Sequence, residues 1–167
     1  MIILLKKFTA LLIVPILLLS MTSKKNVDFS GEWKLNETKS EMGQYAPIVP
    51  LKIKAEQKAD ALVITKTSPG MDGSGEVTAS ETLTFDGKQI ETNVAPGNSK
   101  RKASAKWSDD GQTLTITYIL MLDFNGQSTE VKGTETWALS NEGKTLTTTN
   151  TSSSSFGDNT YKGVYEK

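Results

Sequence analysis

The feature that most constrains this chain is the pattern S-x-[DE]-G-[QK]-T-L-T-x-T, which begins at Ser108 and again at Ser140. In each copy the glycine supplies the positive φ of a tight turn, and the acidic residue before it tolerates turn conformations. The alternating, Thr-rich run that follows favours a β-strand. Each copy therefore predicts the corner of a β-hairpin.

The same alternation of apolar and polar residues continues along the chain from Val27 onward. It predicts strands over 27–36, 51–58, 61–67, 76–85, 89–95, 100–107, 113–122, 128–139, 145–154 and 160–167. Most links are short turns such as Asp86-Gly87, Pro96-Gly97-Asn98 and Asn125-Gly126. Glu37–Pro50 is longer, and we expect it to form a turn or a short helical turn at one end of the fold.

Consecutive strands joined by tight turns form an antiparallel meander, and closing the meander removes its exposed edges. We therefore expect an all-β, antiparallel up-and-down meander barrel of about 8–10 strands. A sandwich of two sheets is the alternative, although it needs longer crossover links than most of those in this chain.

The first residues predict the compartment. Lys6 and Lys7 precede an apolar run, Phe8–Leu19, and small residues follow it, as in a secretory signal. The run is shorter than the roughly 20 residues of a membrane span, and Pro15 interrupts it. We predict a signal peptide over 1–23 and a barrel domain over 24–167, secreted or periplasmic, with no stable membrane span. There is no Cys to carry a lipid anchor.

Composition excludes several functions. The 19 basic and 19 acidic side chains balance, which argues against a nucleic-acid partner. Without His or Cys, a Ser-His-Asp triad, a thiolate nucleophile and a His or Cys metal site are impossible. The sequence predicts no metal and no cofactor.

Four functional candidates fall on the same faces of their strands as the apolar residues, which are expected to point inward: Glu81, Arg101, Tyr118 and Glu135. Inward-facing charges must pair with one another or meet a ligand, because burying an unpaired charge is costly. One hypothesis is that Arg101 and Tyr118 hold the polar head of a ligand. The other is that these side chains lie near strand ends and reach water. Two more candidates for the ligand site are Trp107 and Trp137. The alternative is that both indoles belong to the core.

The segment Phe29–Asn36, followed by Lys39-Ser40, resembles the opening of bacterial lipocalin-like proteins, whose first strand carries G-x-W, here Gly31-Glu32-Trp33. Thr136-Trp137, the repeated corner and the final Gly163–Lys167 are similar to secreted members of that group. The resemblance implies a barrel that binds a small, mostly apolar molecule. Trp33 would close one end of this barrel beneath a basic residue of the last strand, for which Lys162 is the candidate.

Three functions remain open from the sequence. The first is extracytoplasmic binding of a small hydrophobic or amphipathic molecule inside the barrel. The second is an isomerase or hydrolase that uses Glu81 or Glu135 as acid or base, with a pKa raised by burial. The third is a structural or interaction domain whose barrel is filled by side chains. No residue pattern requires the enzyme.

Overall fold

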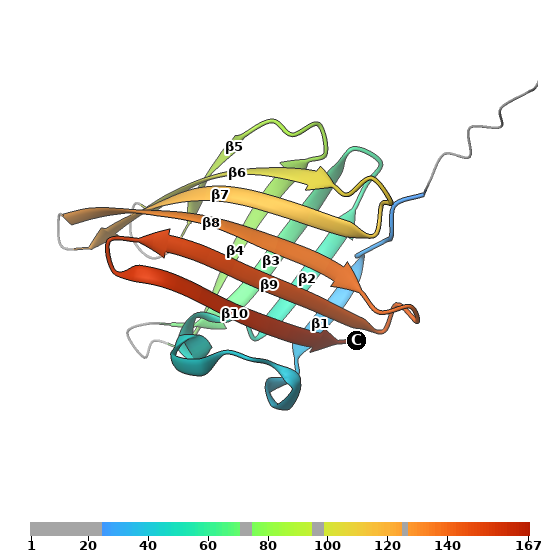
Figure 1. Cartoon of the computed structure of the whole chain (residues 1–167), viewed down its shortest axis with the longest axis horizontal. Helices are drawn as coiled ribbons and strands as arrows, with labels where there is room; N and C mark the ends of the chain where they lie inside the picture. The colour runs from blue at the N-terminus through green and yellow to red at the C-terminus, as the bar shows by residue number, and fades with distance from the viewer. Residues whose placement is uncertain (1–24, 71–74, 95–98, 125–126) are drawn as a thin grey trace, which may run out of the picture.

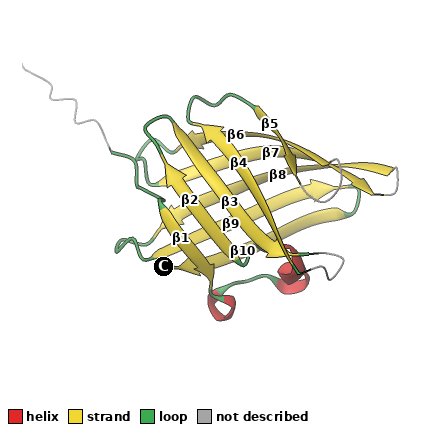
Figure 2. Ribbon diagram, turned by 180° about the vertical axis from the view of Figure 1, so that it is seen from behind, coloured by secondary structure: helices red, strands yellow, loops and turns green. Residues whose placement is uncertain are grey.

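The computed structural model describes residues 25–70, 75–94, 99–124 and 127–167, which form one ten-stranded antiparallel sheet (Figure 1). The strands are β1 Gly31–Leu35, β2 Lys52–Gln57, β3 Ala61–Pro69, β4 Glu76–Thr84, β5 Ile90–Val94, β6 Ser99–Trp107, β7 Thr113–Phe124, β8 Gln127–Leu139, β9 Thr145–Ser154 and β10 Gly157–Glu166. All ten predicted strands are present. The sheet curls so that β6–β10 face β1–β4 across an interior, as Figures 1 and 2 show from opposite sides.

The order β4-β3-β2-β1-β10-β9-β8-β7-β6-β5 explains how the sheet closes. The first strand pairs with both β2 and the last strand, with Lys34 opposite Glu166. The two strands at the ends of this order, β4 and β5, follow each other in sequence but do not form a ladder in the described residues. The result is a nearly closed up-and-down barrel with one seam, so the barrel prediction is confirmed and the sandwich alternative is wrong.

The two copies of the repeated pattern form the same corner. Gly111 and Gly143 have φ of 69° and 66°. In the first, the Ser108 hydroxyl accepts the amide N–H of Thr113 at 3.0 Å; in the second, Ser140 accepts that of Thr145 at 3.2 Å. Serine therefore closes each turn by side chain as well as by backbone, which explains why it begins the pattern.

The long link after β1 contains two short 3-10 helices, η1 Glu37–Lys39 and η2 Gly43–Ile48. Asn36 caps η1 by accepting the amide N–H of Lys39 at 3.2 Å. Glu41 then forms an isolated bridge with Lys162 of β10, and η2 contacts β3. β1 and β2 are shorter than the flanking strands β10 and β3. The link therefore passes the ends of β1 and β2 on its way from β10 to β3.

The end of the barrel that carries the repeated corners is closed by the chain segment before β1. The amide N–H of Val27 donates to the Gly111 carbonyl at 3.0 Å, and the Gln57 side chain donates to the Val27 carbonyl at 2.8 Å. The segment thus reaches from the β6–β7 corner to the end of β2. Its Phe29 is fully buried, and the Trp33 indole donates to the Phe29 carbonyl at 2.9 Å.

The basic residue over Trp33 is Lys167, not Lys162. The Lys167 Nζ lies 4.7 Å from the centroid of the indole, whereas Lys162 pairs with Glu41 at 2.9 Å. The register is the reason: the last residues of β10 are those opposite β1. Gly31 has φ of 142°, and a Cβ there would lie 2.9 Å from Lys167 Cε. The G-x-W motif therefore leaves room for the lysine and places the ring beneath it.

Three predictions fall outside the described residues: the signal peptide over 1–23, the turn at 96–98 and the turn at 125–126. Within the described part of the chain, neither short helix is long and apolar enough to cross a membrane.

Candidate functional site

Glu81, Arg101 and Glu135 all point into the barrel, and Arg101 is the third residue of β6. Their side chains are 10%, 11% and 6% exposed. The hypothesis that these side chains reach water is therefore wrong. The alternation of the sequence placed them on the inward face correctly, because the neighbours two positions away, such as Leu83 and Ala103, are buried too.

Arg101 joins the two carboxylates. Its Nη1 forms a hydrogen-bonded ion pair with Glu81 across the β4–β5 seam, and its Nη2 lies 3.8 Å from Glu135 Oε2. A fourth charge comes from Lys66 on β3, whose Nζ donates to both oxygens of Glu135 at 2.7 Å. We call these four residues the charged cluster: Lys66, Glu81, Arg101 and Glu135.

Glu135 is held as a carboxylate at the centre of the cluster. Burial raises its pKa, but the positive charges of Lys66 and Arg101 outweigh burial, and the pKa is lowered from its ordinary value of 4.5. The Trp137 indole adds a 2.6 Å hydrogen bond to Oε1. The predicted raised pKa, on which an acid or base role for Glu135 depended, is therefore wrong for this residue.

Tyr118 lies beside the cluster and reaches across one strand. Arg101 Cζ is 4.5 Å from the centroid of its ring, and its hydroxyl hydrogen bonds the side-chain amide of Asn150 on β9 at 3.0–3.1 Å. Gly133 stands opposite Tyr118 on the intervening β8, where a Cβ would lie 2.4 Å from the phenol. The glycine therefore lets the ring pass. Burial raises the pKa of Tyr118 above its ordinary value of 10.0, so the phenol stays neutral.

Along β4, β7 and β8, the exposure of the inward-facing side chains differs on the two sides of the charged cluster. Toward the closed end the inward side chains are buried, as at Leu83, Leu114 and Trp137. Toward the other end the inward side chains of these three strands are half-buried: Val77, Ala79, Leu120, Leu122, Thr129 and Val131. On these three strands the charged cluster therefore lies between buried inward side chains and half-buried ones, whereas Ser99 of β6 and Ser152 of β9, beyond the cluster, are buried.

The two candidate tryptophans lie on the packed side. Trp137 is fully buried, and Trp107 is half-buried. Phe29 stacks on Trp107 with centroids 5.4 Å apart and meets Trp137 edge-on at 5.5 Å. Trp137 touches the cluster through its hydrogen bond to Glu135. Direct contact of either indole with a ligand remains a prediction.

Sequence reasoning missed Lys66 and the role of Asn150. Lys66 continues the inward phase of Leu62 and Ile64, so the alternation of β3 contained the signal. Asn150 shares the inward phase of Leu146, and the register places it opposite Glu135. What the sequence lacks is any indication that β3 and β8 bring Lys66 and Glu135 together across the interior.

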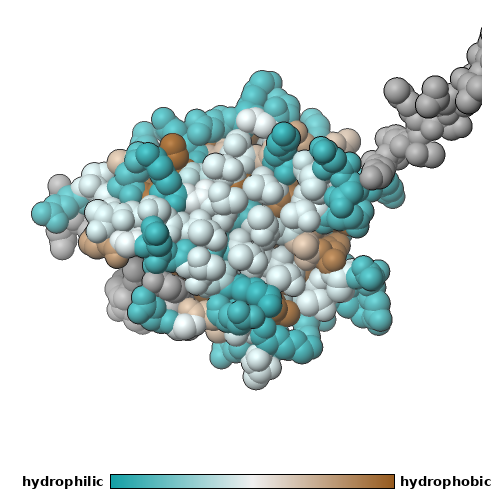
Figure 3. All heavy atoms as spheres, viewed as in Figure 1, coloured by the Kyte–Doolittle hydropathy of each residue, from teal (hydrophilic) through white to brown (hydrophobic). Residues whose placement is uncertain are grey.

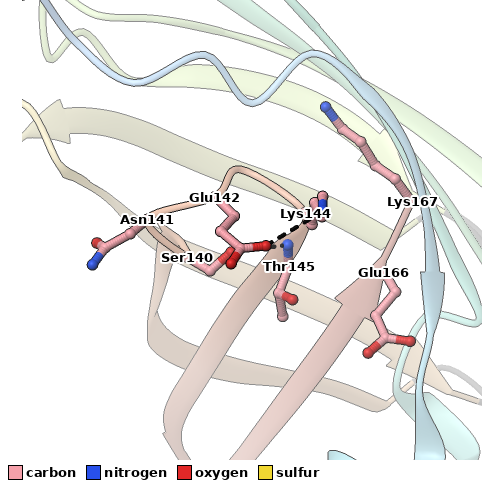
Figure 4. A pocket seen from close by; sticks show the side chains of 7 residues that line it. All are labelled: Ser140, Asn141, Glu142, Lys144, Thr145, Glu166 and Lys167. Atoms are coloured by element: carbon pink, nitrogen blue, oxygen red, sulfur yellow. Dashed lines mark hydrogen bonds and ion pairs between the residues drawn. The ribbon is translucent and has the colours of Figure 1, made fainter.

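The outer surface carries a hollow of about 610 Å³ at the β8–β9 corner (Figure 4). It is lined by Ser140, Asn141, Glu142, Lys144, Thr145, Glu166 and Lys167. Glu142 and Lys144 pair there at 3.4 Å, with side chains 75% and 78% exposed. None of the predicted site residues belongs to this hollow.

The outside of β7–β10 carries a Thr-rich face. Four threonines lie side by side in one row across the four strands, Thr117, Thr134, Thr151 and Thr160. All are at least partly exposed. Figure 3 shows this face as a pale field with hydrophilic residues mainly around it.

The chain is thus an antiparallel β-barrel with one packed end and a charged cluster in its interior. Neither a protein-family model nor a curated protein sequence matches it.

Proposed function

We propose that this protein binds a small hydrophobic or amphipathic molecule inside its barrel. The ligand lies on the solvent-reached side of the charged cluster. Its polar end meets the layer formed by the cluster with Tyr118 and Asn150, and its apolar body contacts side chains such as Leu120 and Val131. Few, well-placed polar groups among apolar ones are the usual lining of a small-molecule site.

The observation that carries the proposal is the charged cluster itself. Its side chains are at most 22% exposed, and they interrupt the apolar inward faces of β3, β4, β6 and β8. Replacing charges buried this deeply by apolar side chains of similar volume is often neutral or stabilising. A binding role supplies a reason for having them at this depth.

We further propose that the protein acts outside the cytoplasm and is related to bacterial lipocalin-like proteins. The support is the predicted signal peptide and the arrangement of Gly31, Trp33 and Lys167 at the first strand of an up-and-down barrel. Trp33 is 1% exposed and closes the end of the barrel away from the proposed site.

The test is the binding of an uncharged, environment-sensitive dye, followed by fluorescence, to paired variants. Val131→Trp places a bulky side chain inside the proposed site, while Lys132→Trp places the same side chain outside, because neighbouring residues of β8 face opposite ways. We expect wild type and Lys132→Trp to bind the dye equally and Val131→Trp to lose most of its affinity.

Equal binding by both variants would remove the interior from consideration. Native mass spectrometry of protein purified from its own host adds an independent measurement, since a co-purifying molecule identifies the ligand class directly. Loss of that molecule in Val131→Trp, with retention in Lys132→Trp, would place it in the barrel.

A filled barrel without a ligand is the second candidate, and the packed end favours it. Phe29, Trp33, Leu114, Trp137 and Tyr165 are each at most 1% exposed there. Under this alternative the dye does not bind to the wild type at all.

A further inference from the structure

The charged cluster is balanced, and this property bears on the chemistry of the ligand. In the described part of the interior it contributes two cations, Lys66 and Arg101, and two carboxylates, Glu81 and Glu135. Each cation contacts at least one carboxylate, and each carboxylate contacts at least one cation. Across the residues that the structure describes, the cluster therefore presents no net charge to a ligand.

The contacts of Arg101 leave little for an anionic head group. One nitrogen of the guanidinium is bound to Glu81, and another lies 3.8 Å from Glu135. The ring of Tyr118 is within 4.5 Å of Cζ. A carboxylate from a ligand would have to displace one of the glutamates from the paired geometry that arginine favours, and it would then lie beside the charge it displaced.

Lys66 is engaged in the same way. Its Nζ donates to both oxygens of Glu135 at 2.7 Å, and it lies 5.9 Å from the Trp137 ring. A cationic head group meets the converse difficulty, because both glutamates already have cationic partners. Either charged ligand would leave an unbalanced charge in an interior of low polarity, which is costly.

Neutral hydrogen-bonding groups adjoin the cluster. The Tyr118 phenol and the Asn150 amide are buried and bond each other. The residues Thr148 and Ser152, 3% and 8% exposed, lie in the inward phase of the same strand as Asn150 and carry hydroxyls. The Asn150 side chain alone has two donor hydrogens and two acceptor lone pairs, more than one partner can use. An uncharged polar group can be added here without disturbing the ion pairs.

Resting on the proposed function, we infer that the ligand ends in an uncharged polar group, such as an alcohol, ketone or amide, received by Tyr118 and Asn150 rather than by Arg101. Arg101 is then a positioning residue that holds the Tyr118 ring. The half-buried Leu120, Leu122 and Val131 contact the apolar body.

The test uses four probes with the same apolar chain and different ends: dodecanol, dodecanamide, dodecanoate and dodecylamine. Each competes with the uncharged dye for purified wild-type protein at neutral pH. We expect the alcohol and the amide to displace the dye at concentrations at least about tenfold lower than the acid or the amine, which corresponds to about 1.4 kcal/mol.

Single neutralisations make the result specific. Glu81→Gln leaves one positive charge in excess, so dodecanoate should gain affinity by roughly tenfold or more. Lys66→Met leaves one negative charge in excess, so dodecylamine should gain instead. The matched control is Glu76→Gln, which changes the net charge of the protein equally but lies on the exposed outer end of β4, where Glu76 pairs with Lys52.

The outcomes are distinguishable. If wild type binds the dye but dodecanoate or dodecylamine competes best, or all four probes compete equally, the inference is overturned while the proposed function stands. If the dye does not bind inside the barrel, the proposed function fails. Should Glu81→Gln not fold, as judged by circular dichroism, Glu135→Gln gives the same excess charge, and Tyr118→Phe should weaken the alcohol without strengthening the acid.

Discussion

Removing the charge of Glu135 is the most direct test of how the interior is built. Glu135→Gln keeps the shape of the side chain and an oxygen able to accept the Trp137 indole N–H, now 2.6 Å from Oε1. It removes the negative charge to which Lys66 donates twice at 2.7 Å. Arg101 keeps Glu81, so Lys66 is the group left without a counter-charge.

The expected loss follows from burial. Breaking a buried ion pair by removing one partner costs about 3–5 kcal/mol. Lys66 is 22% exposed and can recover part of its hydration, so we expect the lower end, about 3 kcal/mol. In a domain of this size that corresponds to a fall in Tm of roughly 6–12 °C. Lys66→Met should cost a similar amount. The double variant should cost about 2 kcal/mol less than the sum of the single variants, because no charge is then left unpaired.

The assay is urea unfolding at pH 7, followed by tryptophan fluorescence and by circular dichroism, with coincident transitions required. Glu56→Gln is the control: it breaks the Lys54–Glu56 pair, 2.9 Å long with both side chains 55% exposed, and should leave the midpoint unchanged.

The dependence of stability on pH adds a second readout. The folded-state pKa of Glu135 is lowered, so its contribution is complete above about pH 4.5 and is lost as the pH falls through that lowered value. Glu135→Gln should therefore flatten the acid limb of the stability profile. The reasoning would be refuted if Glu135→Gln lost no more stability than Glu56→Gln. It would also be refuted if the loss in the double variant equalled the sum of the losses in the single variants.

Three further predictions concern other parts of the barrel. Gly133→Ala should destabilise by about 1–3 kcal/mol in urea unfolding, because its Cβ would lie 2.4 Å from Tyr118; an unchanged midpoint would contradict the close approach. Lys167→Met should lower stability by about 0.5–1 kcal/mol and shift tryptophan fluorescence, since it removes the cation 4.7 Å from the indole beneath it, and Lys162→Met should leave the fluorescence unchanged. Burial raises the pKa of Tyr118 above 10.0, so its contribution to stability should be intact below about pH 10 and lost above it; ultraviolet titration of phenolate absorbance in native protein should accordingly be delayed relative to protein in urea.

The strands were predictable because their signals are local. The repeated corners needed only a serine, an acidic residue and a glycine at fixed spacing, and the structure gives both the same hydrogen bonds. Period-two alternation then assigned a face to every residue of a strand, including charged ones such as Arg101. The inward placement of Glu81 and Glu135 followed from the same rule.

The contacts across the interior were not predictable from these signals. The alternation predicts that Glu135 faces inward. It does not predict which inward side chain Glu135 contacts, because the contact with Lys66 depends on how tightly the ten-stranded sheet curls. The misplaced lysine over Trp33 has a similar cause. Its position depends on the register between β1 and β10, where Lys34 lies opposite Glu166, and that register is set by the whole circuit of the barrel.

The cluster can finally be separated from the stability of the fold. Replacing Lys66, Glu81, Arg101 and Glu135 together by apolar residues of similar volume removes every charge at once, and such exchanges of buried ion pairs are often neutral or stabilising by about 1–4 kcal/mol. If the cluster exists for the ligand, this variant should unfold at the same or a higher urea concentration than wild type yet bind dodecanol and dodecanamide more weakly, because Arg101 no longer holds the Tyr118 ring. If the cluster exists for the barrel, the variant should lose strand content by circular dichroism or unfold more readily. The two readouts oppose each other, so a single protein preparation decides between a binding and a structural reason for burying these four charges.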